Sequence, residues 1–143
     1  MDDIAQISAG QTHVLLLTTD GRLYSWEDNT EIFHIMDEVK YINANFNQSF
    51  AITNDGQLWG WGANSDGQLG IGTTATRQTA PMAIMPDVAA VATGNNHTLA
   101  VTTAGRLYAW GGNSRGQLGD GGTESQYSPI FVMDGVEVNR IAR

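Results

Sequence analysis

Histidines are the side chains best suited to metal chemistry in this 143-residue chain, because the sequence contains no cysteine. His13 and His97 stand at equivalent places in two copies of a repeated stretch, and the third copy has Gln48 there. Glutamine is a poor zinc ligand, and the geometry of a zinc site would require residues of different copies to converge on one point. We therefore interpret His13 and His97 as structural hydrogen-bonding residues and expect no metal site.

The glycine-rich stretch Gly67–Gly72 is a second candidate for chemistry. On the EF-hand pattern, with Asp66 at position five, Gly62 falls at position one and Thr73 at position twelve, and neither can donate a carboxylate. The stretch also lacks the Lys-Ser/Thr pair and the following helix of a phosphate-binding loop. Without cysteine, the chain has no thiol nucleophile. We expect a noncatalytic protein that has no cofactor.

Charged side chains that differ between the copies are the remaining candidates for function. Seven Lys and Arg oppose fifteen Asp and Glu, which gives a net charge of −8. This charge argues against direct DNA binding, which depends on Lys and Arg, and it suits a basic protein partner. A solvated acidic edge that keeps sheets from pairing is the alternative interpretation. The candidate partner contacts are Glu27, Asp28, Glu31, Asp66, Arg77 and Arg115.

The elements that position these side chains form a repeat. Segments 13–26, 48–61 and 97–110 align without gaps, and a short Ile/Val-x-x-Ile/Val strand signal precedes each. Alternation of large and small side chains predicts β-strands, and Asp-Gly in the first two copies predicts hairpins. The third copy has Ala104-Gly105, which we expect to be a poorer turn because alanine resists positive φ. A proline-led strand closes the second and third copies, so each of these units has four strands.

Strands with one bulky and one small face suit sheets that stack closely on one another. The large aromatic residues are expected to pack in the core, and Leu69 and Leu118 to insert their loops into it. The residues expected to build the units are Trp26, Trp61, Trp110, His13, His97, Gly67, Leu69, Gly70, Gly116, Leu118 and Gly119.

One long motif recurs in Trp61–Gly72 and Trp110–Gly121, with the pattern Trp-Gly-x-Asn-x-x-Gly-Gln-Leu-Gly-x-Gly. Together with the hairpin before it and the proline-led strand after it, the motif resembles the regulator of chromosome condensation repeat. The resemblance implies a β-propeller blade, usually one of about seven in a ring. It also implies association with guanine-nucleotide exchange on small GTPases, although no residue here can be matched to that activity. The first copy departs from the pattern, since Glu27-Asp28-Asn29-Thr30 stand in place of the long loop.

The predicted fold is all-β, with three four-stranded propeller blades that form a partial ring or oligomerise. The predicted units are residues 4–38 (abbreviated), 39–87 and 88–137, and residues 138–143 are the first strand of a fourth. The predicted function is a noncatalytic protein–protein interaction module that binds through blade loops. Guanine-nucleotide exchange and a structural, oligomerising propeller fragment are the alternatives.

The predicted partner is another protein, and we expect a homo-oligomer or a part of a longer propeller. No apolar run approaches the roughly 20 residues that span a bilayer, so no membrane association is expected. The acidic start lacks the basic region of a signal peptide. The location stays open: cytoplasmic for a complete chain, extracellular for a fragment.

Overall fold

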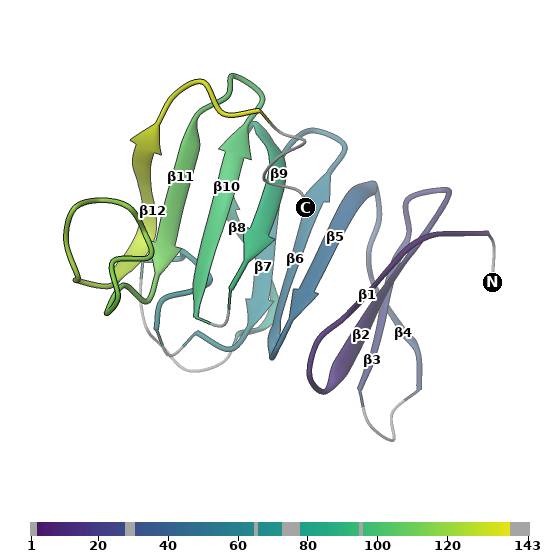
Figure 1. Ribbon diagram of the computed structural model, residues 1–143. Helices are drawn as coiled ribbons and strands as arrows, with labels where there is room; N and C mark the ends of the chain where they lie inside the picture. The colour runs from purple at the N-terminus through teal and green to yellow at the C-terminus, as the bar shows by residue number, and fades with distance from the viewer. Residues whose placement is uncertain (1–2, 28–30, 65, 73–77, 95, 138–143) are drawn as a thin grey trace.

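Three four-stranded antiparallel sheets make up the protein, and they stand next to one another in chain order (Figure 1). A computed structural model describes residues 3–27, 31–64, 66–72, 78–94 and 96–137. The strands of the first sheet are β1 (Ile4–Ala9), β2 (His13–Thr18), β3 (Leu23–Glu27) and β4 (Phe33–Met36). Those of the second sheet are β5 (Val39–Asn45), β6 (Gln48–Thr53), β7 (Leu58–Gly62) and β8 (Gln78–Met85). Those of the third are β9 (Val88–Thr93), β10 (His97–Thr102), β11 (Leu107–Gly111) and β12 (Gln126–Met133).

The predicted all-β fold class is confirmed. Each sheet pairs its strands in sequence order, so every connection within a sheet is a simple antiparallel return. The predicted fourth unit at 138–143 lies outside the described residues, and the unit boundaries stay a prediction. None of the described residues belongs to a helix of the length and apolarity needed to cross a membrane.

The sheets have two distinct ends. The hairpins between the second and third strands of each sheet lie at one end, which we call the hairpin end (top of Figure 1). The segments that follow β3, β7 and β11 lie at the opposite end, which we call the loop end (bottom of Figure 1). The second and third strands have the same lengths in all three sheets and run in the same directions, so equivalent connections lie at the same end.

Hairpins of one design turn the chain at the hairpin end. Thr18 N–H donates to the Arg22 carbonyl at 3.0 Å, and Gly21 closes the turn with φ of 87°. The third copy uses Gly105 with φ of 81° in the same way, and Ala104 is not at positive φ. The expectation of a poorer turn at Ala104 was wrong, because only the glycine of each pair carries the left-handed conformation.

The sheets pack through unlike faces. Between the first two sheets, the aliphatic face of the first sheet meets the tryptophan-bearing face of the second, and the buried members are Leu15, Leu17, Leu23, Val39, Ile42, Ala51 and Trp61. The same arrangement recurs between the second and third sheets, where the buried members are Phe50, Ile52, Leu58, Leu69, Val88, Val91, Ala100 and Trp110. Within the second sheet, a small residue leaves room for a bulky cross-strand neighbour: a Cβ on Gly60 would lie 3.1 Å from the ring of Phe50, its partner on β6.

The outward faces of the first and third sheets have no further sheet against them among the described residues. Ile7 is 66% exposed, whereas its equivalents Ile42 and Val91 are 4% and 0% exposed. At the other end of the stack, Leu99 is only partly buried, whereas its equivalent Phe50 is completely buried. Both terminal faces therefore carry core-type side chains that solvent reaches.

Candidate functional site

The long loop of the second repeat is built into the interface between the second and third sheets. The main-chain carbonyl of Gln68 accepts hydrogen bonds from Trp110 Nε1 at 2.9 Å and from Thr98 Oγ1 at 2.7 Å. The next residue, Leu69, is completely buried in the shared core. The loop thus satisfies two polar groups of the third sheet and fills the space in front of its tryptophan.

Glycine is required at the point where this loop passes the tryptophan. Gly70 has φ of 74°, and a Cβ there would lie 2.6 Å from Trp110 Nε1. Any larger residue would have to push the indole ring out of its place. The close approach of backbone and ring explains why glycine follows leucine in this motif.

Buried asparagines hold both long loops in shape. Asn64 Oδ1 accepts a hydrogen bond from Leu69 N–H at 3.1 Å, and Asn113 Oδ1 accepts the equivalent bond from Leu118 N–H at 3.0 Å. Asn64 is 1% exposed and Asn113 is not exposed at all. Sequence reasoning did not single them out, although their recurrence at the same place in both motifs was the available signal.

The first repeat lacks such a loop, and a cleft of about 480 Å³ lies between the first and second sheets at the loop end. Trp61 and Ser49 occupy in this cleft the places that Trp110 and Thr98 occupy one sheet further on. Phe33 and Pro81 line it from the two outer strands. The shortened first repeat therefore leaves a cleft between the first and second sheets, at the place where a loop fills the interface between the second and third sheets.

A hydrogen bond between the sheets forms the inner wall of the cleft. His13 Nε2 and Ser49 Oγ are 2.8 Å apart, and His13 is 7% exposed. His97, at the equivalent place in the third sheet, has a buried Nδ1 without a partner among the described residues. Burial lowers the pKa of His97, because it disfavours the charged imidazolium. The equivalent histidines thus differ because, within the described residues, only His13 has a following sheet to contact.

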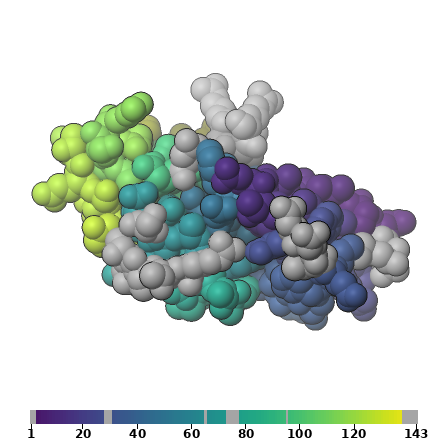
Figure 2. Space-filling view, turned by 90° about the horizontal axis from the view of Figure 1, so that it is seen from below, coloured from purple at the N-terminus to yellow at the C-terminus, as the bar shows by residue number. Residues whose placement is uncertain are grey.

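Figure 2 shows the molecule from below, which is the side of the loop end. The charged candidates that the structure describes all lie in segments at this end. Glu27 lines the cleft and Glu31 is exposed just before β4. Asp66 and Arg115 lie on the loops of the second and third repeats, and Arg115 lines a separate hollow beside His97. Asp28 and Arg77 lie outside the described residues.

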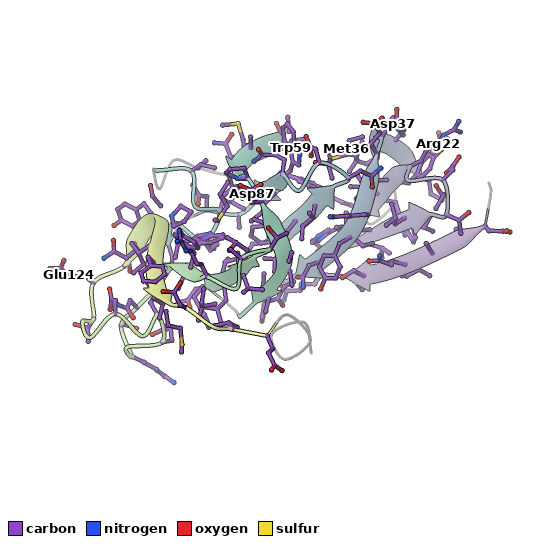
Figure 3. The ribbon with its side chains drawn as sticks, turned by 90° about the horizontal axis from the view of Figure 1, so that it is seen from above. Arg22, Met36, Asp37, Trp59, Asp87 and Glu124 are labelled. Atoms are coloured by element: carbon purple, nitrogen blue, oxygen red, sulfur yellow. The ribbon has the colours of Figure 1, made fainter. Side chains whose placement is uncertain are left out.

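The remaining acidic residues near the first repeat belong to the other end of the molecule. Asp37 follows β4 at the hairpin end, near Arg22 (Figure 3). Its Oδ1 lies 2.7 Å from His34 Nε2. Strand β4 lies between Glu31 and Asp37 in the chain. These acidic residues are close in sequence, but they lie at opposite ends of the first sheet.

Two aspartates at the hairpin end have structural partners. The hydroxyl of Thr18 donates to the Asp20 carboxylate, and that of Thr53 donates to Asp55 at 2.5 Å. These hydrogen bonds stabilise the ionised carboxylates and lower the pKa of both aspartates. Their recurrence in equivalent hairpins assigns them to turn formation.

Across the part of the chain that is described, no three His, Asp or Glu side chains gather in a way that could hold a metal ion.

Comparison with known structures shows the same arrangement of strands in larger proteins. Prp20p from Saccharomyces cerevisiae, whose structure was reported with its binding properties to Gsp1p and histones, is 21% identical with a TM-score of 0.80 over 92% of this chain. Yeast RCC1 (Prp20) bound to Kap60 is 23% identical with a TM-score of 0.79 over 94% of this chain. Human WBSCR16 is 21% identical with a TM-score of 0.55 over 92% of this chain and 53% of its own length. This chain spans 38% of the length of each of the first two proteins.

Family comparison agrees with the structural neighbours, although no curated protein sequence matches the chain. The Regulator of chromosome condensation (RCC1) repeat matches residues 55–101 and 104–142. A second description of the same repeat matches residues 4–30, 39–68 and 88–117, which includes the abbreviated first copy. These matches cover more than half of the sequence, and the chain belongs to the RCC1 repeat family of β-propeller proteins.

Proposed function

We propose that this chain is a noncatalytic protein-interaction module that binds its partner at the loop end. The observation that carries the proposal is the cleft beside Glu27, which lies where the first repeat departs from the other two. Residues that recur in every repeat build the fold, so a specific function belongs where one repeat departs from the others. Loops presented by a rigid scaffold are also the usual place for recognition.

The partner that suits this surface is a basic protein. The chain has a net charge of −8, and Glu27 and Glu31 lie together at the loop end of the first sheet. Complementary charge raises association rates more than it raises affinity. Histones are suitable probes because they are basic, and the structurally similar Prp20p was studied for its binding to histones.

Charge reversal at the loop end should slow binding to core histones. In the double variant Glu27→Lys, Glu31→Lys, we expect the association rate constant to fall by about tenfold at low salt, because long-range attraction is removed. The variant Asp37→Lys, Glu38→Lys is the matched control, since it makes the same change of net charge at the hairpin end. Stopped-flow or biosensor kinetics would measure both. Equal slowing in the two variants would show that net charge alone matters and would contradict a loop-end site.

A separate assay distinguishes guanine-nucleotide exchange from protein binding. Release of a fluorescent nucleotide from a small GTPase, with and without this chain, measures exchange directly. The proposed binding function predicts an unchanged release rate, whereas acceleration would favour the exchange alternative.

A second candidate function, assembly with further propeller blades, is favoured by the exposed terminal faces. Ile7 is 66% exposed at a position that is buried in the other two sheets. A second copy, or further blades of a longer chain, would cover it. Solution mass by light scattering tests this candidate: a stable, cooperatively folded monomer of about 15.4 kDa would count against assembly.

A further inference from the structure

The interface between the second and third sheets shows which kind of segment packs against a blade tryptophan, Trp110. Between the second and third sheets, the occupant is a loop that gives a main-chain carbonyl to Trp110 Nε1, buries Leu69 and passes the indole with Gly70. Each of these three interactions uses backbone or a common side chain, so a segment of another protein could make them as well.

The cleft between the first and second sheets offers the same groups without that occupant. Trp61 Nε1 has no hydrogen-bond partner among the described residues, whereas Trp110 Nε1 donates to Gln68. Trp61 is 8% exposed and Trp110 is 0% exposed. Around Gly111, the nearest atoms include Gln68 Cα, but around the equivalent Gly62 they belong only to Asn47 and Gln48. Among the described residues, the donor of the second sheet therefore lies at the cleft without a partner.

The second donor is also in place. Ser49 stands where Thr98 donates to the loop carbonyl, and its hydroxyl is 2.8 Å from His13 Nε2. A serine hydroxyl can accept a hydrogen bond from a histidine and still donate its own proton. Ser49 can thus donate to a carbonyl in the cleft while its contact with His13 is kept.

Apolar side chains complete the cleft. Phe33, which is 50% exposed, and Ile35 line it from β4, and Ala80 and Pro81 line it from β8. A volume of about 480 Å³ is sufficient for a leucine side chain and the residues on either side of it. The cleft thus combines apolar side chains from β4 and β8 with two hydrogen-bond donors at its inner wall, and polar residues such as Glu27 and Gln78 also line it.

From these observations we propose that the cleft binds a loop or extended segment of a partner protein that contains an apolar residue followed by glycine. The carbonyl before the apolar residue accepts from Trp61 Nε1 and Ser49 Oγ. The apolar side chain lies between Phe33 and Pro81, and the glycine passes the indole of Trp61. This inference rests on the proposed binding function and names the chemistry of the bound segment.

A synthetic peptide with the sequence of residues 63–72 tests the proposal on the complete chain. We expect it to shift the indole N–H resonance of Trp61, which is identified among the four tryptophans with the variant Trp61→Phe. Affinity of about 1 mM is expected, since ordering a short flexible peptide opposes binding. The control peptide carries Leu69→Asp and Gly70→Val. A Trp61 resonance that responds to neither peptide, or equally to both, would overturn the proposal.

Variants of the protein locate the site independently. The variant Trp61→Phe keeps an aromatic ring but removes the N–H donor. We expect about tenfold weaker peptide binding for the loss of one hydrogen bond, followed at the Ser49 and Phe33 amides. The exposed substitution Ala80→Trp should block the cleft and abolish binding, whereas Ala83→Trp on the same strand, outside the cleft, should not. Unchanged affinity in Ala80→Trp would place the peptide elsewhere.

The proposed binding of a basic protein and the proposed ligand of the cleft can be disproved independently. If charge reversal at Glu27 and Glu31 slows histone association but the peptide never reaches Trp61, the cleft proposal is wrong and the binding function stands. If the peptide binds at Trp61 but no basic protein associates, the cleft proposal stands and the charge-guided partner is wrong.

Discussion

Replacement of Trp110 by alanine should lower the free energy of unfolding by about 3–5 kcal/mol. The side chain is completely buried between the second and third sheets, where it packs with Phe50, Leu69 and Val91. Its Nε1 also donates to the Gln68 carbonyl, so truncation both opens a cavity and removes the hydrogen bond that anchors the loop. Urea denaturation followed by circular dichroism would measure the loss.

The matched control is the equivalent tryptophan of the first sheet. Trp26 is only partly buried, and no sheet packs against its face among the described residues. We expect Trp26→Ala to cost under about 2 kcal/mol, because less apolar surface returns to water. Equal losses for Trp26→Ala and Trp110→Ala would contradict the stacking order described above.

The second large effect is expected at Gly62. This residue has φ of 107°, and a Cβ there would overlap the main-chain oxygen of Asn47. That oxygen accepts a hydrogen bond from Ala63 N–H at 2.9 Å, so a shift of the backbone would break the bond. We expect Gly62→Ala to destabilise the protein by about 3 kcal/mol or more, from backbone strain and steric overlap together.

The variant Gly121→Ala measures the cost of backbone strain without steric overlap. Gly121 has φ of 84°, but a Cβ there would meet nothing within 4 Å. Its substitution should therefore cost only the strain of about 1–2 kcal/mol for a left-handed alanine. Thermal unfolding of the two variants side by side gives the comparison, and similar midpoints would show that the space around Gly62 is less restricted than the structure indicates.

Much of the fold could be predicted from the sequence because it follows from local rules. Alternation of large and small side chains identified the strands, and glycine at the hairpins identified the turns. The turn at Ala104 was misjudged because the rule was applied to the wrong residue of the pair. Gly105 takes the positive φ in that copy, as Gly21 does in the first.

The candidate site could not be predicted in the same way, because it depends on contacts between repeats. Alignment showed that the first copy lacks a loop, but the resulting cleft is visible only when the second sheet places Trp61 and Ser49 opposite the gap. The bond from His13 to Ser49 likewise joins residues 36 positions apart in neighbouring repeats. Alignment also makes Ile7 equivalent to Val91, although stacking buries only Val91.

The unlike faces of each sheet give the stack a direction. At both interfaces, the face with Leu15 or Phe50 meets the tryptophan-bearing face of the following sheet, with Trp61 or Trp110. The two terminal faces are therefore complementary to each other, and neither is complementary to itself. An isologous contact, in which one surface pairs with its own copy across a two-fold axis, therefore does not suit either terminal face. Assembly of copies through these faces would be heterologous, so it would either close into a ring or continue as an open helical filament.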